Sequence, residues 1–120
     1  IKPSIIEKRN IKKTKMETFK KIEIVKKIVK DYYNKYHKYC GIPELSNMDK
    51  NHIIKTGTEI LSLKWNISKH SGGFVEAFVN NDLTRAIANV DGTNMMALKF
   101  FAQMSWNVGA PSELFENSAV

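Results

Sequence analysis

Apolar residues recur at steps of three and four along the first third of the chain, and this period constrains the fold more than any other sequence feature. They are Met16, Phe19, Ile22, Val25, Val29, Tyr32, Tyr36 and Tyr39. Such steps are the period of an α-helix that buries one face, and lysines occupy the other faces. Gly41 and Pro43 then stop the helix, so the spacing predicts a helix over residues 14–40.

Capping residues and chain breakers predict three more helices. We expect them over residues 49–68, 73–89 and 91–107. Asp49 and Asp91 are candidate N-caps, because a short acidic side chain can accept from the free N–H groups of a first turn. Residues 61–67 alternate like a strand and Gly57 weakens a helix, but no second convincing strand exists to pair with them. The sequence therefore predicts an all-α fold of four helices.

Length and charge describe a single domain with an uneven surface. The 120 residues have room for one modest core, and 42% of them are apolar. Residues 1–38 hold 13 basic and four acidic side chains, a net +9, whereas residues 39–120 hold six basic and eight acidic ones, a net −2. We therefore expect a basic N-terminal arm over residues 1–40 and a helical body over residues 41–120.

The basic arm indicates a polyanionic partner, or simply a solvated helix face. If the partner is a nucleic acid, the contacting residues are expected to be Lys12, Lys13, Lys15, Lys20, Lys21, Lys26, Lys27, Lys30 and Lys35. The stretch from Asp31 to Cys40 also interleaves tyrosines with Lys35 and Lys38, as single-strand grooves do. The simpler interpretation is that these tyrosines pack on the body with their hydroxyls in water.

The location follows from what the sequence lacks. Cys40 is the only cysteine, which fits a reducing compartment, and no apolar run is long enough to cross a membrane. We expect a cytoplasmic protein without a membrane partner. Because the sequence does not begin with Met, we expect a processed chain or a fragment.

Two polar residues interrupt the apolar face of the predicted third helix. Asp82 falls within that face, and Asn89 lies two turns later. Asp82 can pair with Arg85 or cap a helix restarted after Asn80 and Asn81. Alternatively, the strip Asn81, Asp82, Arg85 and Asn89 meets another subunit, or it forms part of a ligand site.

The predicted fourth helix is apolar nearly all round. One stripe consists of Met95, Leu98, Phe101, Ala102 and Trp106, and only Lys99, Gln103 and Asn107 form a polar ridge. Such a helix needs cover on more than one side, and a chain of this size has little material to supply it. We therefore expect a homo-oligomer. The stripe should face the chain's own core, and Met96, Phe100 and Met104 should contact another subunit.

Polar and apolar residues of the C-terminal third stand at matching positions in a known family. They are Gly72, Gly73, Phe74, Ala77, Asn81, Asp82, Leu83, Ala86, Asp91, Asn94, Asn107 and Pro111. This pattern resembles short proteins of tailed phages and prophages, a family with no established function. The chain departs from it at His70 and Ser71, where prolines are frequent, and lacks a later Cys-Trp-Gly stretch. The resemblance implies a phage or mobile-element origin and carries over no catalytic residue.

The best candidate for an anion site is the turn before the third helix. Lys69 and His70 flank Ser71, Gly72 and Gly73, where free N–H groups of a helix start favour phosphate. Arg85 and Lys64 add charge if the fold brings them close. The simpler interpretation is a plain turn with a serine cap.

Chemistry beyond binding finds little support. His37 and Cys40 can share a helical face, but no further ligand pattern completes a metal site, and no cofactor is expected. Neither a nucleophile with its base nor a carboxylate pair is indicated. We therefore expect a non-enzymatic phage accessory protein that captures or blocks a host protein or a small phosphorylated signal. The alternative is a nucleic-acid-binding protein that uses the lysine-rich arm.

Overall fold

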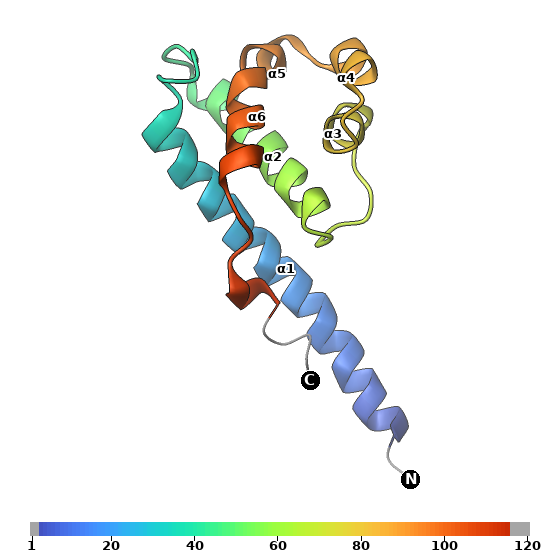
Figure 1. Cartoon of the computed structure of the whole chain (residues 1–120). Coiled ribbons are helices and arrows are strands. Elements are labelled where there is room, and N and C mark those ends of the chain that lie inside the picture. Colours follow the sequence, from blue (N-terminus) through green and yellow to red (C-terminus); the bar gives the residue numbers. More distant parts are fainter. Residues whose placement is uncertain (1–2, 116–120) are drawn as a thin grey trace.

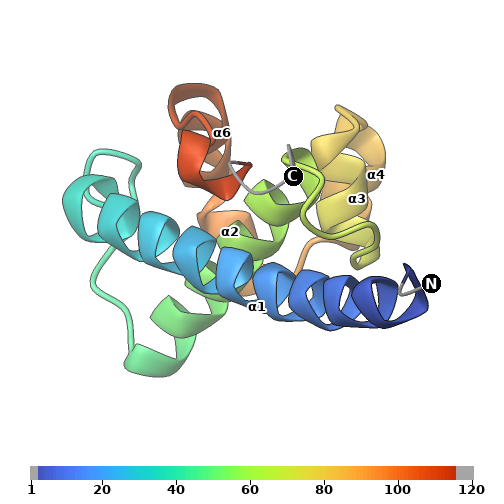
Figure 2. The same ribbon diagram turned by 90° about the horizontal axis from the view of Figure 1, so that it is seen from below.

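The computed structural model describes the backbone of residues 3–115 and the side chains of residues 17–115. Within these residues all regular structure is helical, which confirms the predicted all-α class. The elements are α1 (Pro3–Tyr36), α2 (Asn47–Lys64), α3 (Gly73–Val79), α4 (Leu83–Asn89), α5 (Gly92–Met96), α6 (Leu98–Asn107) and the 3-10 turn η1 (Ser112–Leu114). Figures 1 and 2 show their arrangement.

Two of the four predicted helices are each divided in two. The predicted helix 73–89 breaks between α3 and α4, where Asn81 adopts a left-handed φ of 60°. Asparagine tolerates this conformation better than most residues, so the Asn80–Asn81 pair can end one helix before the next begins. The predicted helix 91–107 breaks at Ala97, between α5 and α6.

The second helix starts two residues earlier than predicted and also ends earlier. Ser46, not Asp49, is its N-cap, and the Ser46 Oγ accepts from the Asp49 N–H at 3.2 Å. The segment 61–67 continues the helix to Lys64, as preferred over a strand. The chain then leaves the helix through Asn66, whose φ is 59°.

Helix α2 forms the centre of the molecule. It packs against α1, α3, α5 and α6, with α1 on one side and the α3–α4 pair on the other (Figure 1). Its fully buried side chains include Ile53, Ile60 and Leu61. A helix buried on several sides needs small residues where neighbours approach closely, and the buried Gly57 lies at such a point.

Helix α1 belongs to this same core along its C-terminal half. Val25 and Val29 are fully buried and Tyr33 nearly so, against α2 and α6. The N-terminal turns of α1 extend past the other helices (Figure 1), and the molecule measures 59 × 29 × 25 Å. The predicted boundary at residue 40 therefore does not separate an arm from a body, because residues 25–36 pack as part of the body.

Candidate functional site

At the predicted anion site before α3, the chain itself supplies one acceptor. The backbone N–H of Ser71 donates to Glu76 Oε1 at 3.1 Å, so a carboxylate already accepts from this turn. Lys69 and His70 are exposed beside it. A second anion there would lie against the negative charge of Glu76, so the local sequence disfavours phosphate at Ser71, Gly72 and Gly73.

The polar strip of the predicted third helix consists of local helix-end contacts. Asp82 is exposed and caps α4, with its Oδ1 accepting from the Arg85 backbone N–H at 3.1 Å. Asn89 Nδ2 donates to the Arg85 carbonyl at 2.9 Å. Both polar residues are exposed because the helix restarts after Asn81. The restart changes the helical register and turns Asp82 and Asn89 outward. Of the interpretations offered by the sequence, the restarted helix with its cap is confirmed.

The predicted subunit-contact residues of α6 lie instead in the chain's own core. Phe100 and Met104 are fully buried, and the Phe100 ring lies 5.5 Å from the ring of Tyr33 in α1. The expectation of an inter-subunit contact at these two residues is therefore wrong, because α1 covers this face of α6. Met96, by contrast, is 45% exposed. The opposite stripe, expected to face the core, leaves Trp106 almost entirely in solvent.

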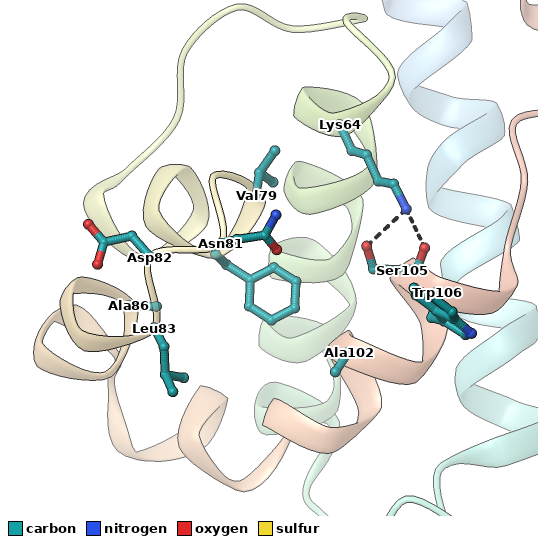
Figure 3. A pocket seen from close by; sticks show the side chains of 10 residues that line it. Lys64, Val79, Asn81, Asp82, Leu83, Ala86, Ala102, Ser105 and Trp106 are labelled. Atoms are coloured by element: carbon teal, nitrogen blue, oxygen red, sulfur yellow. Dashed lines mark hydrogen bonds between the residues drawn. The ribbon is translucent and has the colours of Figure 1, made fainter.

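An apolar groove separates α4 from α6 (Figure 3). It has a volume of about 520 Å³. Its lining residues are Lys64, Phe78, Val79, Asn81, Asp82, Leu83, Ala86, Ala102, Ser105 and Trp106. In Figure 3, Leu83 of α4 and Trp106 of α6 lie on opposite sides, whereas Asp82 points away. Most of the surface that a ligand would meet here is therefore hydrocarbon.

The groove is built on ordered aromatic packing. The ring of Phe78 lies 6.3 Å from the fully buried Phe101 in an edge-on arrangement, and 6.0 Å from Phe74. At one end Lys64 Nζ donates to the Ser105 carbonyl and, at 3.2 Å, to its Oγ (Figure 3). This contact links α2 to α6 and engages Lys64, which the sequence offered as a possible additional charge for the anion site.

The exposure of the two residues flanking the groove is unusual. Trp106 is 89% exposed and Leu83 is 73% exposed, although both are large and apolar. Single exposed apolar residues are common, but several around one depression are typical of interaction surfaces. Sequence reasoning missed this site because it placed Trp106 on the core-facing stripe. The sequence did hold one signal for it, the polar ridge Lys99, Gln103 and Asn107. A polar ridge on α6 indicates that part of the helix stays in water, so the whole of that stripe could not be buried.

A second depression lies on the other side of α6, against α1. It is lined by Tyr32, Lys35, Tyr36, Tyr39, Gln103 and Asn107. Asn107 Nδ2 donates to the Tyr32 hydroxyl at 3.3 Å, which joins the two helices. The segment rich in tyrosine and lysine and the polar ridge of α6 thus meet at one place, although they are far apart in the sequence.

The predicted nucleic-acid lysines are only partly described. Lys20, Lys26, Lys27, Lys30 and Lys35 are exposed, and Lys21 is half-buried with its Nζ 5.8 Å from the Phe115 ring centre. Lys27 pairs with Asp31 at 3.1 Å. The side chains of Lys12, Lys13 and Lys15 lie outside the described residues.

A polar cluster between α2 and α5 was not predicted. His52 Nε2 and Asp91 Oδ2 are 2.8 Å apart, and the buried Asn94 donates from Nδ2 to Thr56 Oγ1 at 3.0 Å. Asp91 also caps α5, as predicted, by accepting from the Asn94 N–H at 2.7 Å. Burial alone would raise the pKa of Asp91. However, the hydrogen bonds from Asn94, His52 and Thr93 together with the charge of His52 lower it below its usual range.

The candidate metal ligands of the sequence make other contacts. The Cys40 thiol donates to Gln103 Oε1 at 3.0 Å, and the His37 Nδ1 lies 2.8 Å from the Tyr33 carbonyl. Among the described residues no three His, Cys, Asp or Glu side chains are grouped to hold a metal ion. No helix in the described part of the chain has the length and hydropathy needed to span a bilayer.

Comparison of the chain with protein-family models, with curated proteins and with solved structures gave no significant match. The positions that carry the resemblance to phage proteins do have clear structural roles. Asp82 and Asp91 cap helices, Ala77 and Ala86 are buried, and Gly73 lies against Asn89. These are roles in building the fold.

Proposed function

We propose that this chain is a non-enzymatic binding protein that captures a protein partner in the groove between α4 and α6. The observation that carries the proposal is the pair Leu83 and Trp106, which stand exposed on opposite sides of an apolar depression. Exposed apolar residues that flank a concave surface gain free energy when a partner removes them from water. Tryptophan in particular is enriched among residues that dominate binding energies.

The groove favours an apolar helix or side-chain cluster over a small phosphorylated ligand. Lys64, the one lysine among its lining residues, is engaged by Ser105, and Asp82 adds negative charge at the edge. An amphipathic helix can place apolar side chains at steps of three and four into such a groove. The resemblance to phage-encoded proteins makes a host protein the expected partner.

The proposal of a binding role rather than catalysis is supported by how the polar groups are used. The His52–Asp91 pair holds α2 against α5 through Asn94 and Thr56, and Cys40 is buried against Gln103. The Cys40 thiol is held in a buried internal contact, and the half-exposed His52 and Asp91 both have hydrogen-bond partners within the chain. A general base or a nucleophile needs instead to reach a substrate.

The test is an affinity capture from cells of the natural host, followed by identification of the captured protein and titration of the purified pair. Leu83→Ser and Trp106→Ala are expected to weaken binding at least about tenfold, as hot-spot losses do. Phe19→Ala is the matched control, because Phe19 is 71% exposed but belongs to α1. Equal affinity of all four chains would overturn the proposal.

A second copy of the chain is the other possible occupant of the groove, and sedimentation distinguishes it. If the groove binds another copy, the wild type sediments as a dimer and Trp106→Ala as a monomer. If it binds a different protein, both sediment as monomers and only the captured partner is lost.

A further inference from the structure

The depression between α1 and α6 brings together two features that the proposed function does not use. Tyr32, Lys35, Tyr36 and Tyr39 come from the end of α1 and the turn after it, whereas Gln103 and Asn107 come from α6. We call this surface the tyrosine groove. Its volume is about 730 Å³, and none of its lining residues is acidic.

The tyrosine groove presents a row of neighbouring, mutually tilted aromatic rings that differ in exposure. The rings of Tyr32 and Tyr36 have centroids 4.6 Å apart, and those of Tyr36 and Tyr39 are 6.5 Å apart. Tyr32 and Tyr36 are half-buried, but Tyr39 is 80% exposed. Tyrosines that simply pack on a body would hide their rings and expose their hydroxyls. Here Tyr33 hides its ring, whereas Tyr39 leaves most of its surface in water.

Three exposed lysines belong to the elements that form this groove. Lys35 Nζ lies 5.3 Å from the centre of the Tyr36 ring, and Lys38 is exposed in the turn before Tyr39. Lys99 lies one helical turn before Gln103 on the same ridge of α6 and is also exposed. The segment 32–39 holds two lysines and no acidic residue. The side-chain amides of Gln103 and Asn107 add hydrogen-bonding groups along the opposite wall.

We propose that the tyrosine groove binds single-stranded nucleic acid. Unpaired bases can stack on the exposed ring of Tyr39 and on Tyr36, and Lys35, Lys38 and Lys99 can contact the phosphates. Aromatic platforms combined with lysines are the general means by which proteins hold single strands without reading sequence. A duplex keeps its bases stacked inside and presents only phosphates, so it can use the lysines but not the tyrosine rings.

This site is independent of the α4–α6 groove, because the two lie on different sides of α6 and share no lining residue. It also differs from the lysine-rich arm predicted from the sequence. Lys20, Lys27 and Lys30 are exposed on other faces of α1, away from the tyrosine rings. The structure therefore concentrates base contacts at the end of α1.

The experiment is a fluorescence-anisotropy titration of the full chain with a labelled oligothymidylate of about twelve nucleotides, within the site sizes known for single-strand binders. A duplex of the same length is titrated in parallel, each at about 50 and 200 mM salt. Tyr39→Ala is expected to weaken single-strand binding roughly 5- to 150-fold, the range for loss of one stacked base. Tyr39→Phe should retain the affinity, because the stacking ring remains.

Four further variants separate base stacking from general attraction to a basic protein. Lys35→Ala should weaken binding and make the affinity less dependent on salt. Lys30→Ala, on another face of α1, should change the affinity and its salt dependence less. Phe19→Ala and Leu83→Ser should leave affinity unchanged, since both residues are exposed far from the tyrosine groove. The proposal is overturned if the wild type does not prefer the single strand. It is also overturned if Tyr39→Ala binds as tightly as the wild type, or if Phe19→Ala loses as much as Tyr39→Ala.

Discussion

Gly57 of α2 lies directly against Val29 of α1. A Cβ added at Gly57 would lie 2.8 Å from the Val29 Cγ1 and 3.2 Å from the Met104 Cε of α6. Real Cβ atoms do not approach a neighbour as closely as the first of these distances. The three longest helices therefore meet at a point that only glycine fits. The contact fixes how α1 is joined to the rest of the molecule.

The first prediction follows from this contact. Gly57→Ala should gain about 1 kcal/mol of helix propensity, but overpacking against a stiff β-branched side chain costs about 1–3 kcal/mol. We expect a net loss of stability, measured by urea unfolding.

The control is the double variant with Val29→Ala, which removes the atom that would clash. The double variant should be more stable than the sum of the two single changes predicts. Simple additivity of the two losses would contradict the contact.

The helices themselves were readable from the sequence because their signals are local. The period of Val25, Val29 and Tyr36 and the cap at Asp91 depend only on neighbours in the chain. Gly57 looked like a weakness in α2 because its role depends on α1 and α6, which sequence spacing does not place. The same holds for the break at Ala97, where no glycine or proline marks the change from α5 to α6.

The second prediction concerns the Asp91 carboxylate. Its pKa lies below the unfolded value of about 3.9, so the ionised form stabilises the fold. This contribution is complete well above that value and is lost as the pH falls through the lower folded pKa. Asp91→Asn should therefore lose less stability than the wild type on acidification below about pH 5. Unfolding free energies between about pH 2 and 6 check this.

Asp31→Asn provides the matched control for this measurement. Asp31 forms an exposed pair with Lys27, and such pairs contribute little to stability. If Asp91→Asn and the wild type lose stability in parallel on acidification, the role assigned to Asp91 is wrong.

The third prediction concerns the thiol of Cys40. Burial raises its pKa, and the opposing charge of Lys99 is the smaller influence. Because the thiolate is the reactive form, iodoacetamide should modify the folded chain at pH 8 much more slowly than the chain unfolded in urea. Mass spectrometry measures the extent of modification over time. Rapid modification of the folded protein would show that the contact with Gln103 opens readily.

The candidate sites were less predictable than the helices. The tyrosines near residue 36 and the ridge of Gln103 and Asn107 were each visible in the sequence, but not their meeting. That meeting depends on the crossing of α1 and α6. Likewise, the apolar faces of α6 did not reveal which one α1 would cover, and the assignment of Phe100 to a subunit contact failed for that reason. The capping role of Asp82 could be predicted from the sequence, because a helix cap depends only on residues nearby in the chain.

The fourth prediction tests that cap. Asp82→Ala should cost about 1 kcal/mol, because the Arg85 N–H loses its acceptor. Asp82→Asn should cost much less, since asparagine caps about as well as aspartate. Thermal unfolding of the two variants checks the difference. If both lose the same stability, the carboxylate charge matters more than the cap.

The last prediction compares two aromatic residues of α6. The sequence pattern predicts a subunit contact for Phe100 and a core position for Trp106, whereas the structure buries Phe100 and exposes Trp106. Phe100 is fully buried among Tyr32, Tyr33 and Phe101, with ring distances of 5.5–5.8 Å. Phe100→Ala should therefore cost about 3–5 kcal/mol, and a charge at this position should unfold the chain rather than dissociate it. Trp106→Ala should change stability by no more than about 0.5 kcal/mol, because its ring is in solvent. Urea unfolding at two protein concentrations measures both effects and shows whether association contributes. A stable, folded Phe100→Asp chain of lower mass than the wild type would restore the subunit-contact assignment and contradict the burial of Phe100 by α1.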